Sequence, residues 1–422
     1  MNILMMTNTY LPFVGGVERS VETYTEEYRK RGHRAIIVAP FYENCPDREV
    51  DVIRVPAIQH FNGTDFSVQL PVPGVLNSAL KDFTPHIIHS HHPYLLGDSA
   101  LRLAASYKIP IVFTFHTFYE RYTHYVPGDS PALKRFVTSL ATGYANLCDL
   151  VIAPSRAVGA ELVKRGVYAP VEVLPTGIPV ERFAGGDRQK MRRKLGIHSD
   201  AFVVGFVSRL APEKNVSFLA QAIGEFLVDH PRTHFLMAGD GPSRDEICSR
   251  FQGESYRGRF HFLGTLQGQD LVDVYRAMDV FAFASSTETQ GLVLTEALAS
   301  GVPVVSLDVP VVCEVVRDGY NGFVAEDGAA FKRALLRVMK GGPLLRAQLR
   351  KHAVESARDY DRGSCAQRAL KMYEKLLGRS FVHRDHADSS WSKAMRMIRT
   401  ELELIVNMTK ATGAAFNDHD KM

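Results

Sequence analysis

Residues 286–306 read STETQGLVLTEALASGVPVVS, and this stretch places two glutamates around the start of one helix. Glu288 precedes the expected helix and Glu296 lies within it, with seven residues between them. Gly301 ends the helix, because glycine readily adopts the backbone conformation that follows a helix C-terminus. The apolar run from Val302 is then a strand, so the stretch predicts a helix-to-strand unit of an α/β fold.

The start of this helix predicts an anion site, because backbone amides at a helix N-terminus point outward with partial positive charge. The amides concerned are those of Gln290, Gly291 and Leu292. Glu288 and Glu296 would repel a phosphate there, so their expected role is to accept hydrogen bonds from sugar hydroxyls. A glutamate pair alone is more often surface charge, and the ordered combination is what makes the pattern specific.

Outward from this stretch, short apolar runs alternate with amphipathic ones, which is typical of parallel sheets with crossover helices. The first set of expected strands is 2–6, 35–40, 86–89, 109–115 and 150–153. The second set is 202–207, 234–238, 260–263, 280–284 and 302–306. A glycine pair and a charge run within 177–200 suggest an interdomain linker. We therefore predict an α/β protein with domains at 1–185 and 186–378 and a helical extension at 379–422.

Composition narrows the class of protein. The 422 residues are 45% hydrophobic and 23% charged, as in soluble globular proteins, and no apolar run is long enough to span a bilayer. Five scattered cysteines without CxxC spacing predict free thiols in a reducing cytosol, and no signal peptide is recognisable. The net charge of +4 suits an anionic small molecule or lipid surface, whereas dispersed basic residues argue against nucleic acid.

Two loops are candidates for binding phosphate. Gly15 and Gly16 link the first strand to the first helix, where no Cβ keeps a ligand from the backbone, although such a pair is often a plain tight turn. Arg209 and Lys214, in VSRLAPEKN, follow the first strand of the second domain. A guanidinium fork and an ammonium together suit a diphosphate, and two solvated loop cations are the alternative.

In their order along the chain these motifs resemble the retaining glycosyltransferases of family 4. The resemblance spans about residues 1–378 and also includes APSRAV at 153–158, LPTGIPVERF at 174–183 and AGDGP at 238–242. It implies the GT-B fold, in which two Rossmann-like βα domains face a central cleft. It also implies transfer of a hexose from a nucleotide diphosphate sugar to a hydroxyl, with retention at the anomeric carbon and no metal or other cofactor.

The resemblance implies a role for individual residues. Arg209 and Lys214 would hold the diphosphate, Glu288 the sugar hydroxyls, and Glu296 the ribose hydroxyls. The remaining donor-binding positions would be Gly15, Gly16, Gly241, Gln290, Gly291 and Leu292. No secure nucleophile lies in these motifs, so a front-face mechanism is our hypothesis, in which the departing phosphate accepts the acceptor's proton.

A narrower resemblance lies in HTFYERYTHYVP at 116–127, with IIHSHHPYLLG at 87–97. Both are similar to bacterial diacylglycerol glucosyltransferases, which make monoglucosyldiacylglycerol at the cytosolic membrane face. It implies UDP-glucose as donor, a lipid acceptor and a role in glycolipid biosynthesis. The implied acceptor residues are Tyr119, Tyr122, His124 and Tyr125.

Histidines near this motif have two interpretations. A histidine at a strand end, such as His116, is more often structural, but the resemblance implies that it bonds a donor-sugar hydroxyl. His89, His91 and His92 are close enough in sequence to suggest a metal site. No acidic or cysteine ligand accompanies them, so we expect no metal.

The tail contains an amphipathic segment at 391–408. Its apolar stripe is Trp391, Met395, Ile398, Leu402 and Ile405, and Lys393, Arg396 and Arg399 flank it. One interpretation is a helix that packs on the body or on a second subunit. The other is an interfacial helix at an anionic membrane surface, with the segment 133–147 as a second contact.

These observations predict a hexosyltransferase with a nucleotide sugar and a lipid hydroxyl as substrates, cytoplasmic and peripheral on the inner face of the membrane. Transfer to a soluble or polyprenyl-linked glycan is the alternative acceptor class. A non-catalytic sugar-nucleotide-binding protein is a third candidate, against which the intact set of charged residues argues. The sequence is compatible with a homo-oligomer.

Overall fold

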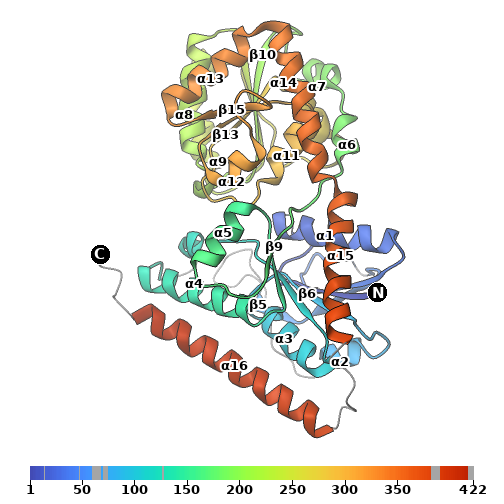
Figure 1. The fold of residues 1–422 in the computed structure, drawn as a ribbon. Coiled ribbons are helices and arrows are strands. Elements are labelled where there is room, and N and C mark those ends of the chain that lie inside the picture. Colours follow the sequence, from blue (N-terminus) through green and yellow to red (C-terminus); the bar gives the residue numbers. More distant parts are fainter. Residues whose placement is uncertain are drawn as a thin grey trace. The chain divides into compact units, whose positions relative to one another are not determined.

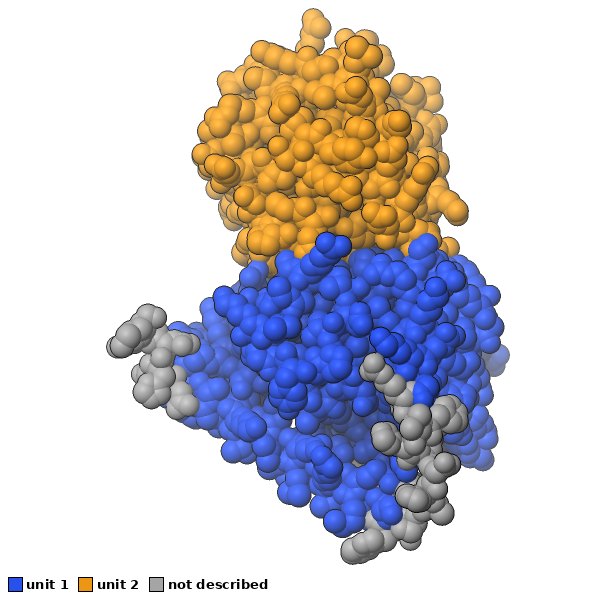
Figure 2. Space-filling model, viewed as in Figure 1, with its two compact units in different colours: residues 1–177, 363–422 blue, residues 178–362 orange. Residues whose placement is uncertain are grey.

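The computed structural model describes residues 1–13, 15–46, 48–58, 68–69, 75–125, 128–381 and 390–416 (Figure 1). The chain forms two compact units (Figure 2): residues 1–177 with 363–422, and residues 178–362. The expected α/β class with two parallel sheets is confirmed, and the boundaries differ from the predicted 185/186 and 378/379 positions.

The first unit is built on a seven-stranded parallel sheet with strand order β3-β2-β1-β6-β7-β8-β9. Its strands are β1 (Asn2–Met6), β2 (Arg34–Pro40), β3 (Val52–Val55), β6 (Ile87–Ser90), β7 (Ile111–Thr114), β8 (Leu150–Ala153) and β9 (Val171–Val173). Strands β4 (Ala57–Ile58) and β5 (Val68–Gln69) form a separate antiparallel pair. The strand order reverses between β1 and β6, which is where open α/β sheets bind ligands.

The helices of the first unit include two from the C-terminal part of the chain. They are α1 (Gly16–Lys30), α2 (Val75–Ala79), α3 (Leu96–Tyr107), α4 (Pro131–Asn146), α5 (Arg156–Lys164), α15 (Arg362–Phe381) and α16 (Ser390–Phe416). Helix α15 returns to the first unit because its apolar face is buried there: Tyr373 is fully buried, and its hydroxyl lies 3.0 Å from that of Tyr28 on α1. This explains why residues 363–378 do not belong to the second unit.

The second unit repeats the pattern with six parallel strands in the order β12-β11-β10-β13-β14-β15. They are β10 (Phe202–Val207), β11 (Thr233–Ala238), β12 (Phe260–Phe262), β13 (Val280–Phe283), β14 (Val304–Leu307) and β15 (Gly322–Ala325). The helices are α6 (Val180–Ala184), α7 (Arg188–Lys194), α8 (Val216–Asp229), α9 (Arg244–Arg250), α10 (Gly268–Ala277), α11 (Leu292–Ala299), α12 (Pro310–Val315), α13 (Gly328–Lys340) and α14 (Gly342–Ala357).

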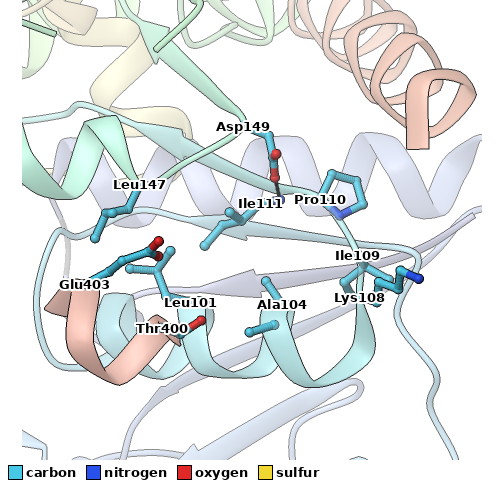
Figure 3. A pocket seen from close by; sticks show the side chains of 11 residues that line it. Leu101, Ala104, Lys108, Ile109, Pro110, Ile111, Leu147, Asp149, Thr400 and Glu403 are labelled. Atoms are coloured by element: carbon cyan, nitrogen blue, oxygen red, sulfur yellow. Dashed lines mark hydrogen bonds between the residues drawn. The ribbon is translucent and has the colours of Figure 1, made fainter. Parts of the chain in front are cut away.

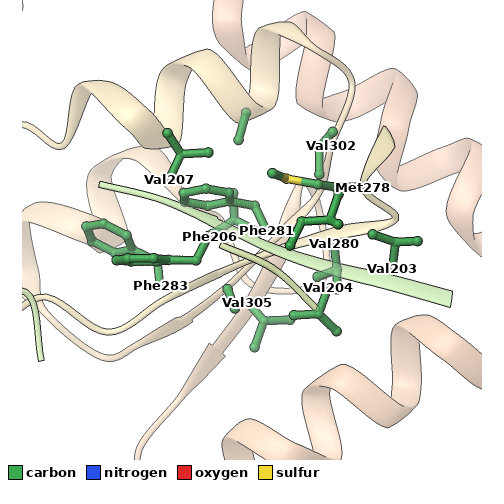
Figure 4. Close-up of a cluster of buried hydrophobic side chains, with 14 of the residues drawn as sticks. Val203, Val204, Phe206, Val207, Met278, Val280, Phe281, Phe283, Val302 and Val305 are labelled. Carbon is green, nitrogen blue, oxygen red and sulfur yellow. The ribbon is translucent and has the colours of Figure 1, made fainter. Parts of the chain in front are cut away.

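The core of the second unit lies around its two central strands. Val203, Val204 and Phe206 on β10 and Val280 and Phe281 on β13 are buried and gather in one apolar cluster (Figure 4). Strands covered on both faces are continuously apolar, which is why these runs were recognisable in the sequence. This rigid centre fixes the ends of β10 and β13, from which the candidate site is built.

The segment 177–200 is not a linker, contrary to the prediction. Most of it folds into α6 and α7 of the second unit, and Arg192 on α7 is only 1% exposed. Its guanidinium forms a 2.8 Å ion pair with Asp279 and donates to the carbonyls of Ala277 and Ala201. The charge run is therefore a short helix with one buried arginine, and not a solvated connection.

Helix α16 packs along α4 and α3, as Figure 1 shows for this C-terminal helix. Thr400, Asn407 and Ala411 are on the packed side, and Asn407 Nδ2 donates to the Leu140 carbonyl on α4. Docking on the body is thus confirmed, but not through the predicted stripe, because Ile398 and Leu402 are more than half exposed. Helix α4, expected as a second membrane contact, supports α16 instead. The side chains of Trp391 and Lys393 and residues 382–389 lie outside the described part.

Candidate active site

Each sheet carries candidate residues in the loops after the carboxyl ends of its strands. In the second unit, Arg209 and Lys214 follow β10, and Glu288 follows β13, the neighbour of β10. In the first unit, Gly15 and Gly16 follow β1, His89 lies in β6, and His91 and His116 follow β6 and β7.

Lys214 and Glu288 form the central contact of the candidate site in the second unit. Lys214 Nζ lies 2.6 Å from Glu288 Oε1, and the two side chains are 17% and 13% exposed. Arg209 is 44% exposed, with Nη1 4.0 Å from Oε1 of the buried Glu213. The structure therefore brings the predicted diphosphate-binding lysine and the predicted sugar-binding glutamate into one charge-assisted hydrogen bond.

Side chains between the two loops hold this pair in place. The hydroxyls of Ser285 and Thr287 donate to the Glu213 carbonyl over 3.2 and 3.1 Å. Asn215, at φ 53°, donates from Nδ2 to the Ala284 carbonyl. The loop after β13 is thereby fastened to the loop after β10 by contacts from three residues that sequence reasoning did not single out.

Gly241, predicted to bind the donor, also has a packing role. At φ 154°, a Cβ on Gly241 would lie 2.4 Å from the Leu210 carbonyl oxygen, and one on Gly239 would lie 1.8 Å from that of Ser208. The backbones of the two loops are this close because the Leu210 amide donates to the Asp240 carbonyl. The AGDGP motif thus shapes the loop that carries Arg209.

Glu296 lies inside α11, which begins after Gly291 at φ 76°. Its side chain is 4% exposed, and its Oε2 accepts a 2.8 Å hydrogen bond from the hydroxyl of Tyr275 on α10. Tyr275 is fully buried and was not predicted as a site residue, because a tyrosine on the apolar face of a helix looks like core. It fixes one carboxylate oxygen of Glu296. Gln290 is buried and Leu292 half-buried at the same helix start.

In the first unit, Gly16 begins α1 and Gly15 is its N-cap residue. An added Cβ on Gly16 would meet nothing within 4 Å, whereas one on Gly15 would lie 2.5 Å from Glu18 Oε2. The buried Glu18 carboxylate accepts hydrogen bonds from the Thr9 hydroxyl and the Gly15 amide, and burial raises its pKa. Glu18 therefore occupies part of the predicted anion site with its own carboxylate, as in a capping box.

His116 lies at the end of β7 in direct contact with His91, at the end of β6. His91 Nδ1 and His116 Nε2 are 2.8 Å apart, and the rings are stacked with centroids 5.1 Å apart. His89 continues the stack, and its Nδ1 lies 2.6 Å from the Tyr373 hydroxyl of α15. His89, His91 and His116 thus form a stack in which His91 and His116 share a hydrogen bond, whereas His92, the third histidine of the predicted cluster, contacts Asn8 and Tyr94.

The protonation of this stack follows from burial. Burial lowers the pKa of His116 and His89 to about 3, and that of His91 well below its usual value, so all three are neutral at pH 7. His91 Nε2 is buried and has no hydrogen-bond partner among the described residues. A proton there would leave a donor unsatisfied, so His91 carries its proton on Nδ1 and donates to His116 Nε2. His116 is therefore protonated on Nδ1.

The predicted acceptor residues divide into two groups. Tyr119 packs its ring against Tyr94 and Phe115, with centroids 5.4 and 6.3 Å away. Tyr122, His124 and Tyr125 form a separate aromatic group, with the His124 and Tyr125 rings 4.2 Å apart. Glu120 anchors this loop through a 2.7 Å ion pair with Arg165, the residue that follows α5.

In the described part of the chain, no three or more His, Cys, Asp or Glu side chains are arranged to hold a metal ion. No helix there is long and apolar enough to cross a membrane. All five cysteines are free thiols.

Comparisons with known proteins place this chain. Residues 14–182 match Glycosyltransferase Family 4, and residues 187–359 match Glycosyl transferases group 1. Fold similarity extends to the crystal structure of Anabaena Alr3699/HepE in complex with UDP, with a TM-score of 0.70 and 21% identity over 89% of this chain and all of that one. The chain thus belongs to the family 4 glycosyltransferases and has the GT-B fold.

Comparison with individual proteins gives more specific similarities than the family match. The chain is 28% identical, over 90% of its length and 98% of the relative's, to the alpha-monoglucosyldiacylglycerol synthase of Acholeplasma laidlawii. It is 30% identical to the enzyme of the same name from Streptococcus pneumoniae, over 76% and 74% of the two chains. It is also 31% identical to a GDP-mannose-dependent alpha-mannosyltransferase of Mycobacterium tuberculosis, over 72% and 79%. Transfer of a sugar from a nucleotide sugar is common to this group.

Acid is expected to destabilise the histidine-rich unit. Burial lowers the pKa of His92 to about 3, whereas an unfolded histidine titrates near pH 6.5. Between these values the unfolded chain binds a proton that the folded chain does not, so the free energy of unfolding falls as the pH falls. The loss is about 2 kcal/mol for this histidine at pH 5.

His92→Asn tests this expectation, because the amide oxygen can replace Nδ1 as acceptor of the Asn8 amide, 3.1 Å away, without titrating. Denaturant unfolding at pH 7 and pH 5 should show a loss about 2 kcal/mol smaller than in the natural chain. The exposed His198, replaced by Gln, is the control. An unchanged pH dependence in His92→Asn would contradict a neutral His92.

Proposed function

We propose that the protein is a retaining hexosyltransferase that moves glucose from UDP-glucose to a lipid hydroxyl such as that of diacylglycerol. The observation that carries the proposal is the Lys214–Glu288 pair, held by the loops after β10 and β13 in a chain whose relatives include two monoglucosyldiacylglycerol synthases. A half-buried cation beside a carboxylate suits a ligand that combines a diphosphate with a polyhydroxylated sugar.

The proposed donor site uses the charges of the second unit. An ammonium has three N–H donors, so Lys214 can hold Glu288 and a phosphate oxygen together. Arg209 supplies a second cation, and the start of α11 near Gly291 supplies backbone amides. The other carboxylate oxygen of Glu288 then accepts from a sugar hydroxyl. Glu296, with one oxygen fixed by Tyr275, is proposed to accept from the ribose hydroxyls through the other.

The proposed chemistry is a front-face displacement. The bond from the anomeric carbon to the diphosphate oxygen breaks, and its electron pair leaves with the nucleotide. Arg209 and Lys214 stabilise the negative charge that grows on the phosphate, the kind of electrostatic contribution that usually dominates catalysis. The acceptor oxygen attacks the same face of the sugar, and its proton passes to the leaving phosphate, so the configuration is retained.

The first unit is proposed to contribute His116 and the aromatic loop. The Nδ1–H of His116, whose position is set by the hydrogen bond from His91, would donate to a donor-sugar hydroxyl. The group of Tyr122, His124 and Tyr125 offers apolar faces with polar edges, which suit the glycerol region of a lipid. A diacylglycerol acceptor resides in a bilayer, so we place the protein peripherally on a membrane surface.

A nucleotide-release screen tests the proposal. UDP-glucose, UDP-galactose and GDP-mannose are each offered with diacylglycerol vesicles, with a soluble glycan and without acceptor. We expect release from UDP-glucose to rise with diacylglycerol, and the product to show an α-linkage by NMR. Stimulation by the glycan alone would overturn the lipid acceptor, a preference for GDP-mannose would overturn the donor, and a β-linked product would overturn retention.

Lys214→Ala and Arg209→Ala are each expected to lower kcat by about 100-fold or more, because each removes a group that stabilises developing charge. Steady-state kinetics and thermal unfolding of the purified variants measure this. Lys351, an exposed lysine on α14, provides the control Lys351→Ala, which should retain full turnover. Normal kcat in a folded Lys214→Ala enzyme would remove this lysine from the mechanism.

Activity is expected to persist in excess EDTA, because cationic side chains and helix amides take the place of a metal ion in the proposed donor site. The measurement is the transfer rate before and after chelation, followed by addition of Mg²⁺, Mn²⁺ or Zn²⁺. Loss of transfer in EDTA with recovery on addition of one cation would show that the reaction needs a metal.

A further inference from the structure

Helix α16 carries most of the strongly exposed large hydrophobic side chains in the described part of the chain. Of fourteen such side chains, eight belong to this one helix: Met395, Met397, Ile398, Leu402, Ile405, Val406, Met408 and Phe416. At 100° per residue, Met395, Ile398, Leu402 and Ile405 fall within one narrow stripe, which we call the outer stripe. A concentration of this kind marks an interaction surface more often than scattered exposed residues do.

The opposite face of α16 is fixed to the body. Asn407 is 7% exposed and donates to the Leu140 carbonyl, while Gly143 on α4 lies so close that a Cβ there would be 1.7 Å from Asn407 Oδ1. Arg135 on α4 donates to the carbonyls of Ala414 and Ala415 near the C-terminal end of α16. The docking face of α16 thus consists of small and polar side chains.

Two further contacts fix the first half of α16 so that the same face of the helix is turned toward the body. Arg396 donates to the Ala105 carbonyl at the end of α3. Arg102 on α3 makes a bidentate pair with Glu401, with Nε–Oε1 2.6 Å and Nη2–Oε2 3.1 Å. These contacts and the Asn407 contact all lie on one side, so the outer stripe faces away from the body.

The outer stripe does not line the pocket that lies beside the helix. A pocket of about 280 Å³ lies between α3, the start of β7 and α16 (Figure 3), lined by apolar residues such as Leu101, Ile109 and Leu147. The side chains that α16 contributes to its lining are Thr400 and Glu403, both from the docking side. Turning the stripe inward to fill this pocket would break the Arg102–Glu401 and Asn407 contacts.

We propose that the outer stripe of α16 enters the headgroup region of an anionic phospholipid bilayer. The outer stripe runs from Met395 to Ile405 on a helix of 27 residues, so it presents an apolar line of about 15 Å, which suits a flat surface. It contains four basic and two acidic residues, and the two acids, Glu401 and Glu403, are paired with Arg102 and Arg399. Arg399 is 81% exposed beside the stripe, and Lys410 is exposed on the same flank.

This inference rests on the proposed function only in its choice of a bilayer as the partner, because a diacylglycerol acceptor has to be reached there. It adds the surface that makes the contact, which none of the candidate active-site residues provides. A second copy of the chain is the competing occupant, and acidic lipid is favoured over it because the helix carries a positive net charge that would repel its own copy.

Vesicle flotation of the full chain tests the surface. The variant replaces Ile398, Leu402 and Ile405 together with Gln, a good helix former that leaves the docking face intact. The matched control replaces three exposed apolar residues on other helices with Gln: Val163, Val228 and Leu344. Vesicles are phosphatidylglycerol with phosphatidylcholine at 1:1, or phosphatidylcholine alone, at low and high salt.

We expect the stripe variant to bind the anionic vesicles at least 10-fold more weakly than the natural chain, and the control variant to bind as the natural chain does. Binding of the natural chain should be weaker on neutral vesicles and should fall as salt rises, because salt screens the basic flank. Arg399→Gln with Lys410→Gln should reduce binding to anionic vesicles without affecting the residual binding to neutral ones.

Equal vesicle binding by the stripe variant and the natural chain would overturn the proposal. A natural chain that is dimeric by sedimentation equilibrium, with a stripe variant that is monomeric but still binds vesicles, would assign the stripe to a second copy. Glucose transfer to a short-chain diacylglycerol in detergent micelles separates the two proposals. The stripe variant should retain this transfer activity. If the natural chain itself showed no transfer in micelles, that result would count against the lipid acceptor and not against the membrane-binding stripe. Circular dichroism and thermal unfolding confirm that each variant is folded.

Discussion

The contact between Lys214 and Glu288 depends on β10 and β13 being neighbours in a parallel sheet, because the two residues are 74 positions apart in the chain. Parallel strands end at the same edge, so loops far apart in sequence meet there. Ser285 and Thr287 then fasten one loop to the other through a single carbonyl, that of Glu213. Gly241 lets the AGDGP loop press against the same region from the β11 side. The contact between the two charged side chains therefore depends on how the backbone of these loops packs. One loop on its own would not maintain this contact.

In the first unit, the carboxyl ends of the parallel strands carry a different kind of polar group. Its polar centre is a stack of neutral histidines across β6 and β7, closed on one side by Tyr373, which the chain supplies only after completing the second unit. Tyr28 on α1 extends this hydrogen-bonded chain. The stack gives His116 a fixed neighbour and a fixed proton position, which a single solvent-exposed histidine would lack. The return of α15 thus helps to build the histidine stack of the first unit.

Much of this could be predicted from the sequence, and the failures have physical causes. Strands covered on both faces are continuous apolar runs, so the sheets and their loops, with Arg209 and Lys214, were recognisable. Arg192 misled the linker prediction because a charge run usually indicates solvent, and only the partner Asp279, 87 residues away, shows that it is buried. Tyr275 and Glu18 were missed because their patterns, an apolar helix face and a first-turn acid, are equally typical of plain helices.

The orientation of α16 could not be predicted from the spacing of its apolar residues. This spacing reveals an apolar stripe, but it does not show which side of the helix packs on the body. Burying an Ile or Leu side chain stabilises a protein by about 1.5–3 kcal/mol, so a helix that only had to pack on the body would turn its apolar stripe inward. Here the inward side is Thr400, Asn407 and Ala411, with Asn407 against Gly143, and the stripe is left in solvent. The folded chain thus lacks the stabilisation that burial of these side chains would give. That stabilisation is gained when another surface covers the stripe. A basic flank beside it makes an anionic lipid surface the cover that best fits both features.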